Sequence, residues 1–139
     1  GDDFPADAPG IEWVGVLDTH ELARLLIKAQ IYAAPSRYEP FGLAPLEAAL
    51  AGCALVLSDI PTFRELWDGC ALFHPPGDID ALGESVLELI RDQALRTALA
   101  GAAMARALER YTPERMAAEY EALYLDVVNR ASQRLAAVE

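Results

Sequence analysis

Two glutamates, Glu39 and Glu47, flank Gly42 in the segment PSRYEPFGLAPLEAALAG. The glycine permits a close approach of the backbone to a ligand, and the residues after it are expected to begin a helix. The N–H groups of Phe41, Gly42 and Leu43 would then face the carboxyl-end edge of a parallel sheet, with the positive end of the helix dipole behind them. This arrangement predicts a site for a phosphate or an anionic leaving group, built without a lysine.

The two carboxylates are suited to binding sugar hydroxyls. Glu39 lies in the loop and Glu47 about a turn into the helix, and helix side chains lean toward the N-terminus, so both can project toward one mouth of the sheet. A carboxylate accepts paired hydrogen bonds from vicinal hydroxyls, so one glutamate could hold a ribose and the other a sugar ring. Spacing alone also fits two solvated surface charges, because exposed glutamates are common.

Short apolar strands alternate with helices along the chain, which indicates parallel strands joined by helical crossovers. Strands are predicted at residues 11–14, 31–34, 54–57 and 71–73. Helices are predicted from an N-cap at Thr19, over 43–51 before Gly52, over 61–67, from Asp78 or Asp80 through 90, on to about 111, and from Thr112 past 128. The predicted fold class is α/β, a Rossmann-like parallel sheet with flanking helices. About four strands are fewer than a complete doubly wound sheet has, so the sheet is expected to be incomplete at its N-terminal side.

Length and charge narrow the functional class. The 139 residues, 53% of them apolar, suffice for one domain with a hydrophobic core. A formal charge of −11 argues against nucleic acid or an anionic membrane as a partner, because both require clustered Lys and Arg. Residues 1–10 are interpreted as a loop and have neither region of a signal peptide, so a cytoplasmic location is expected.

Cysteines and histidines form no metal-binding pattern. Cys53 and Cys70 lie far apart among small apolar residues, which favours buried thiols over metal ligands. His20 is expected to be solvated and His74 to end a strand. No metal is therefore expected.

Polar residues after the third predicted strand could reach the same edge of the sheet. Thr62 and Glu65 are candidates for lining the crevice, because their segment follows a buried strand. Capping of the next helix by Ser58 or Asp59 explains this polar cluster equally well. An arginine in a surface loop is usually solvated, so Arg37 is left out of the predicted site.

The string AQIYAAPSRYEPFGLAPLEAALAG, followed by LVLSDIPTFRELWDGCALFHPPGD, resembles the E-x₇-E region of glycosyltransferase family four. That family includes sucrose synthases, bacterial glycogen synthase relatives and lipopolysaccharide mannosyl- and glucosyltransferases. The resemblance extends from about Val14 to Tyr124. It implies the C-terminal, donor-binding half of a GT-B fold and a transfer that retains the anomeric configuration.

The resemblance also implies roles for individual residues. Glu39 would be the catalytic carboxylate, in contact with hydroxyls of the donor sugar. The N–H groups of Phe41, Gly42 and Leu43 would serve the sugar and pyrophosphate, and Glu47 would bind the ribose. The family moves a hexosyl group from a nucleoside-diphosphate sugar to an acceptor and uses no metal or other cofactor.

The chain departs from the family pattern at its start. The family's Gly-Arg…Lys-Gly segment and its N-terminal, acceptor-binding domain have no counterpart here, so transfer by this chain alone is not expected. Residues 11–111 would form a partial nucleotide-sugar-binding domain, and 112–139 a helix that crosses back to the N-terminal domain. An incomplete sheet leaves an edge open, so we expect self-association through that edge or through the face of Tyr120 and Tyr124. A stand-alone nucleotide-binding module and a GT-B-fold sugar-nucleotide epimerase are the alternatives.

Overall fold

A parallel three-stranded sheet lies at the centre of the computed structural model, which describes residues 9–136 and the side chains as far as 133. Its strands are β1 (Ile31–Ala34), β2 (Ala54–Ser58) and β3 (Ala71–His74), in the order β1-β2-β3. All five residues of β2 are buried, as expected for a central strand with helices on both faces. The α/β prediction is confirmed.

The strand predicted at residues 11–14 is wrong. The described part of the chain forms three strands rather than four, and β1 pairs only with β2 within it. An apolar segment forms a strand only when its backbone hydrogen-bonds to a neighbouring strand. Residues 11–14 pair with none of the described strands.

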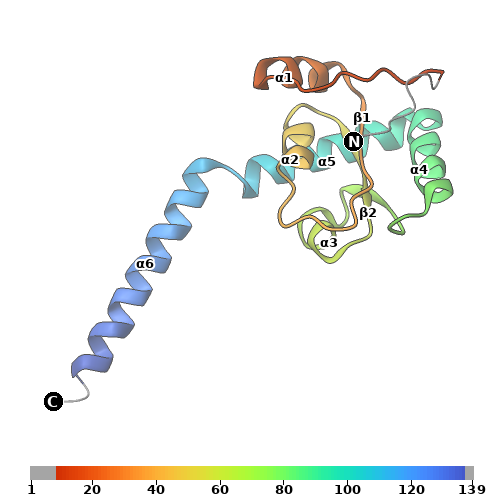
Figure 1. Cartoon of the computed structure of the whole chain (residues 1–139). Helices are drawn as coiled ribbons and strands as arrows, with labels where there is room; N and C mark the ends of the chain where they lie inside the picture. The colour runs from red at the N-terminus through yellow and green to blue at the C-terminus, as the bar shows by residue number, and fades with distance from the viewer. Residues whose placement is uncertain (1–8, 137–139) are drawn as a thin grey trace.

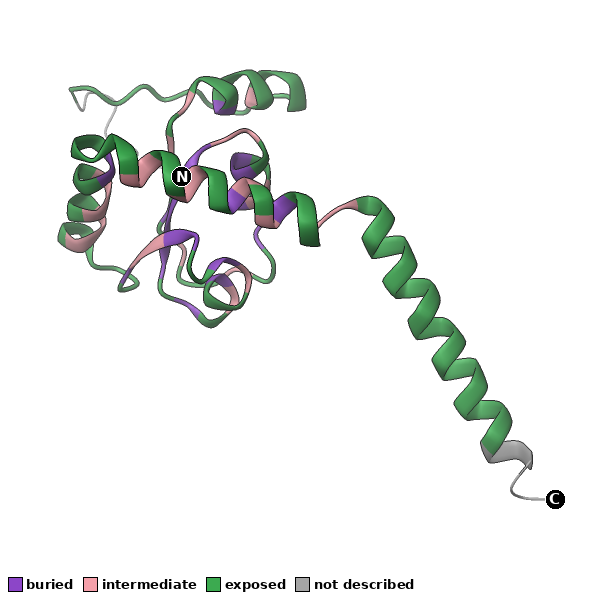
Figure 2. Ribbon diagram, turned by 180° about the vertical axis from the view of Figure 1, so that it is seen from behind, coloured by how far each residue is buried: buried purple, intermediate pink, exposed green. Residues whose placement is uncertain are grey.

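Within residues 9–136, six helices surround or extend from the sheet. They are α1 (Thr19–Lys28), α2 (Leu43–Leu50), α3 (Pro61–Trp67), α4 (Ile79–Arg91), α5 (Gln93–Arg110) and α6 (Pro113–Ala136). Figures 1 and 2 show α1 and α2 on one side of the strands, α4 on the other and α5 running across both. These bounds agree with the predicted helices to within a few residues.

Short polar side chains fix where several helices begin. Asp18, rather than the predicted Thr19, is the N-cap of α1 and forms a capping box with Glu21. Asp78 caps α4, as one of the two predicted alternatives, and Asp92 caps α5. Each carboxylate satisfies an N–H group that has no partner inside its helix.

The two faces of β2 belong to two packed layers. Leu55 and Leu57 pack with residues of α1, α2, α3 and the end of α5. Val56 packs on the opposite face with Leu89 of α4 and with apolar residues of α5. The sheet is therefore clamped between helices, and the carboxyl ends of its strands are held at a fixed edge.

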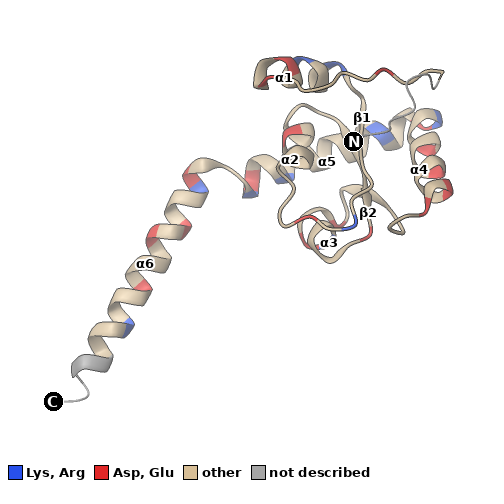
Figure 3. Cartoon of the chain, viewed as in Figure 1, with Lys and Arg blue, Asp and Glu red and all other residues tan. Residues whose placement is uncertain are grey.

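Helix α6 extends away from this α/β body (Figure 1), and its described residues are exposed (Figure 2). Its exposed large apolar residues are Met116, Tyr120, Leu123, Tyr124, Leu125, Val127 and Val128. Acidic residues are spread along α4 and α6 (Figure 3), so the negative charge is distributed over several helices. No helix within residues 9–136 has the length and apolar character needed to cross a membrane.

We expect Leu57→Ala to lower the free energy of unfolding by about 2–5 kcal/mol, because Leu57 is fully buried on β2 and truncation leaves a cavity. Leu87→Ala on the exposed side of α4 is the matched control and should cost about 1 kcal/mol or less. Urea unfolding measures both. Equal losses would contradict the placement of β2 at the centre of the core.

Candidate functional site

The loop between β1 and α2 forms the candidate site at the carboxyl edge of the sheet. Gly42 is the N-cap of α2 and adopts a left-handed conformation, with φ of 88°. Its N–H group donates to Oε1 of Glu39, and the nitrogen–oxygen distance is 3.1 Å. The structure thus brings the predicted catalytic carboxylate directly against the predicted backbone turn.

The start of α2 places N–H groups without an intrahelical acceptor, and with them the positive end of the helix dipole, at this edge. Leu43 and Ala44 are its first residues, and N–H groups at these positions have no acceptor inside a helix. Pro45 has no N–H group, and Leu46 donates to the carbonyl oxygen of Gly42 over 3.3 Å. The first turn contains no acidic residue, so no carboxylate within it offsets the partial positive charge.

The three predicted N–H groups differ in whether they already have an acceptor. The Gly42 N–H group already donates to Glu39, whereas Leu43 lies at the open start of the helix. A ligand that took the Gly42 N–H group would therefore have to displace the Glu39 carboxylate. Such an exchange would couple ligand binding to the position of that carboxylate.

Gly42 has almost no room for a side chain. A Cβ atom there would lie 3.0 Å from Cε1 of Phe63 and 3.4 Å from Cγ of both Glu39 and Pro45. Helix α3 thus meets the loop through Phe63. The predicted crevice residues of α3 lie beside this contact, with Thr62 half-buried and Glu65 exposed.

Tyr32 of β1 is a half-buried tyrosine near both glutamates. Burial raises the pKa of its phenol, and the negative charges of Glu39 and Glu47 raise this pKa further. Both carboxylates therefore act on one half-buried hydroxyl. Sequence reasoning missed Tyr32, because a tyrosine in a strand ordinarily indicates packing.

Glu47 itself faces a different hollow from the loop. It is exposed and lines a cavity of about 310 Å³ between α1 and α2, together with Thr19, Leu22 and Leu50. Both glutamates therefore lie near Tyr32, but their surroundings differ. Different roles for the two carboxylates are consistent with this arrangement.

The polar cluster after β2 does not cap α3. The N-cap is Ile60, which makes no side-chain bond, so the predicted capping by Ser58 or Asp59 is wrong. Asp59 instead forms a two-pronged ion pair with Arg64, at 2.6 and 2.8 Å, and this hydrogen bonding holds the pKa of the Asp59 carboxyl below its usual range. Arg64 also lies over the ring of Phe73, 4.0 Å from its centroid.

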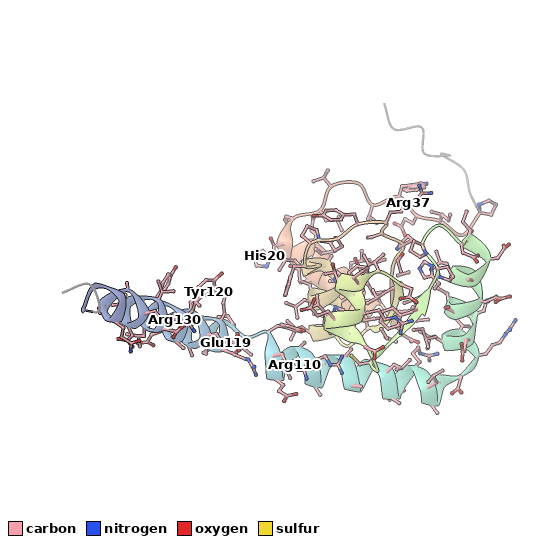
Figure 4. The ribbon with its side chains drawn as sticks, turned by 90° about the horizontal axis from the view of Figure 1, so that it is seen from below. His20, Arg37, Arg110, Glu119, Tyr120 and Arg130 are labelled. Carbon is pink, nitrogen blue, oxygen red and sulfur yellow. The ribbon has the colours of Figure 1, made fainter. Side chains whose placement is uncertain are left out.

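The two histidines, Arg37 and the two cysteines are not among the predicted site residues. Figure 4 shows His20 and Arg37 at separate parts of the rim of the α/β body, and His20 is exposed as predicted. His74 ends β3, also as predicted, and the structure shows that it is buried. Both cysteines are buried, and burial raises their pKa values, so the buried-thiol prediction is confirmed.

A larger hollow of about 630 Å³ lies where α5 meets α6, next to the loop. Phe41, Leu43 and Leu46 line it on one side, and Tyr111 and Met116 are among the residues on the other. Figure 4 shows Arg110, Glu119 and Tyr120 of this lining along the α5–α6 arm. Within the described residues, no group of three or more His, Cys, Asp or Glu is placed to hold a metal ion.

The sequence matches one family over most of its length. A family model described as "Glycosyl transferases group 1" matches residues 8–106. The chain belongs to this family. The match includes the whole site, from β1 through the start of α2.

Curated relatives agree with that assignment. The chain is 36% identical to glycogen synthase of Mycobacterium tuberculosis over 115 residues, which are 81% of the chain and 28% of the relative. It is 32% identical to a phosphatidyl-myo-inositol mannosyltransferase of Mycobacterium leprae over 126 residues, which are 88% of the chain and 33% of the relative. It is 30% identical to O-antigen chain mannosyltransferase B of Escherichia coli over 97 residues, which are 70% of the chain and 26% of the relative. The chain thus spans about a third or less of each relative.

Solved structures establish the fold. Sucrose-phosphate synthase from Thermosynechococcus elongatus superposes with a TM-score of 0.76 at 27% identity, covering 84% of this chain and 30% of that one. TarM superposes with a TM-score of 0.66 at 19% identity, covering 78% and 22%. The α/β body is therefore a Rossmann-like part of a GT-B fold, as the sequence predicts.

We expect Gly42→Ala to lower the free energy of unfolding by about 1–2 kcal/mol, because a left-handed backbone is unfavourable for alanine and its Cβ would press on Phe63. Gly83→Ala in α4 is the control: no atom lies within 4 Å of its Cβ position, so it should stabilise by about 0.5–1 kcal/mol. Thermal or urea unfolding measures whether each substitution raises or lowers the free energy of unfolding. A stabilising Gly42→Ala would show that the turn is not formed as described.

Proposed function

We propose that this chain supplies the donor site of a retaining glycosyltransferase, which moves a hexosyl group from a nucleoside-diphosphate sugar to an acceptor. The single observation that carries the proposal is the contact of Glu39 with the Gly42 N–H group at the open start of α2. A carboxylate for sugar hydroxyls and a helix start for phosphate oxygens are thereby placed within one turn of backbone. Membership of the family supports the same assignment.

In this proposal Glu39 is the catalytic carboxylate and contacts hydroxyls of the donor sugar. The reaction breaks the bond between the anomeric carbon and a phosphate oxygen, and both electrons leave with the nucleoside diphosphate. The acceptor's hydroxyl oxygen forms the new bond to the anomeric carbon, and its proton passes to the departing phosphate. When the donor binds, Glu39 releases the Gly42 N–H group, and the N–H groups of Phe41, Gly42 and Leu43 then face the negative charge that develops on this leaving group. Preorganised donors of this kind stabilise such charge without a cation, so we propose that no metal is required.

Glu47 is proposed to bind the ribose. It lies four residues after Leu43 in α2, which corresponds to about 6 Å along the helix axis. That separation suits a ribose beyond the phosphates at the helix start. Thr62 and Glu65 are proposed to line the crevice at the start of α3, next to the contact of Phe63 with the loop.

Transfer is proposed to need more than this chain. The curated relatives are three or more times as long as the segments that match, so most of each relative has no counterpart here. An N-terminal domain that binds the acceptor and closes over the donor is the proposed partner, reached by the exposed helix α6. The cytoplasmic location stays a prediction.

Calorimetric titration with UDP, GDP, ADP and their glucose and mannose conjugates tests the donor site. We expect one nucleotide to bind, and Glu47→Ala to weaken that binding by about tenfold or more, because the ribose hydroxyls lose a charged acceptor. Glu39→Gln should weaken the sugar conjugate more than the free nucleotide, because Glu39 is assigned to the sugar. Titrations with and without EDTA should agree.

Glu84→Ala is the matched control for these substitutions, because Glu84 is an exposed glutamate of α4, on the other side of the sheet. It should bind as the unchanged chain does. Binding that is insensitive to Glu47→Ala, or equally sensitive to Glu84→Ala, would contradict the assignment of the site. Binding without any dependence on a sugar would favour a nucleotide-binding module.

Self-association is proposed to use the open edge of β1 or the apolar face of α6. Open strand edges pair with other chains, and β1 has one neighbour among the described strands. We expect sedimentation velocity to show dimers or larger species at high micromolar concentration. Tyr120→Glu should abolish them if the α6 face is used, and Ala33→Pro should abolish them if the β1 edge is used. A monomer throughout this range would overturn the proposal.

A further inference from the structure

We propose that Tyr111 is a positioning residue for the donor loop, holding the backbone between Glu39 and Leu43 in its ligand-binding shape through the ring of Phe41. The inference rests on the proposed function, because it assigns a role to Tyr111 within that same site. Tyr111 lies 70 residues from Phe41 and acts without touching the donor.

Three aromatic rings connect the hydrophobic core to the loop. Trp67 is 1% exposed and belongs to the core. Its ring centroid lies 5.8 Å from that of Tyr111, and the Tyr111 centroid lies 5.7 Å from that of Phe41. The Phe41 and Tyr111 planes are at 88°, the edge-to-face geometry that aromatic pairs favour. Tyr111 is therefore the middle ring of a continuous chain of aromatic contacts.

The middle ring is itself held firmly. Tyr111 is the C-cap of α5, and its N–H group donates to the carbonyl oxygen of Ala107 over 3.0 Å. Its hydroxyl lies 3.4 Å from the carbonyl oxygen of Leu66. Arg106 bonds the same carbonyl over 3.2 Å and that of Asp68 over 2.6 Å. The end of α5 is thus tied to the end of α3 by hydrogen bonds from both Tyr111 and Arg106.

Local interactions alone do not fix the conformation of the loop, so it needs a contact with the folded core. Its conformation depends on Gly42, and a glycine reaches positive and negative φ almost equally well. The Glu39–Gly42 hydrogen bond spans only three residues and closes a local turn. Phe41 lies directly before Gly42, so fixing its ring restricts the peptide that carries the Gly42 N–H group. The ring contact with Tyr111 links this local turn to the folded core.

Amide hydrogen exchange of Gly42 and Leu46, whose N–H groups donate to Glu39 and to the carbonyl oxygen of Gly42, tests the inference by NMR without nucleotide. Loss of one aromatic pair in Tyr111→Leu or Phe41→Leu should speed exchange of these two amides by about three- to tenfold. Tyr111→Phe keeps both ring contacts and should exchange as the unchanged chain does. Affinity for the nucleotide should fall by a similar factor in the two leucine variants and recover in Tyr111→Phe.

Arg106→Ala is the control for a purely structural role. It loosens the same junction of α5 with α3 but removes no contact of Phe41. If it speeds exchange of Gly42 and Leu46 as much as Tyr111→Leu does, at matched stability, the inference is overturned. Phe41→Leu gives the same decision should Tyr111→Leu not fold, because Phe41 is 39% exposed. Absence of nucleotide binding by the unchanged chain would remove the proposed function, while the exchange rates would still decide the role of Tyr111.

Discussion

The left-handed turn at Gly42 is the constraint on which the candidate site depends. Glycine is favoured there, because the backbone is left-handed and a Cβ atom would lie 3.0 Å from Cε1 of Phe63, which would have to shift. The turn brings the N–H group of Gly42 to the carboxylate of Glu39 and starts α2 immediately afterwards. One glycine thereby sets the position of a carboxylate and the direction of a helix dipole.

The rest of the fold keeps this turn in place from three directions. The buried strand β2 holds β1 in register, so the loop leaves the sheet at a fixed point. Helix α3 contributes Phe63 beneath the turn, and the end of α5 contributes Tyr111 beside Phe41. Elements from most of the α/β body thus converge on a segment of five residues.

Sequence reasoning found the parts of the site that are local in the chain. Glu39, Gly42 and the start of α2 lie within a few residues of each other, and turn chemistry and helical spacing identify them. The helices were predicted for the same reason. Tyr32 and Tyr111 were missed, because their significance comes from neighbours that only the tertiary structure supplies.

The errors have the same physical origin. A strand at residues 11–14 requires a partner strand, and pairing is a non-local property that an apolar run does not reveal. Asp59 was expected as a possible cap, but Arg64 lies five residues later in the folded helix and forms a charged pair with it instead. Local propensity does not determine whether residues 11–14 form a strand or whether Asp59 caps α3. Contacts with residues farther along the chain determine both.

We propose that nucleotide phosphates bind at the start of α2 and displace the Glu39 carboxylate from the Gly42 N–H group. Changes in ¹H–¹⁵N chemical shift on addition of a nucleoside diphosphate locate the ligand residue by residue. We expect the largest changes at Phe41, Gly42, Leu43 and Ala44, with smaller ones at Glu47. Changes centred on α4 or on the hollow between α5 and α6, with Gly42 and Leu43 unaffected, would contradict it.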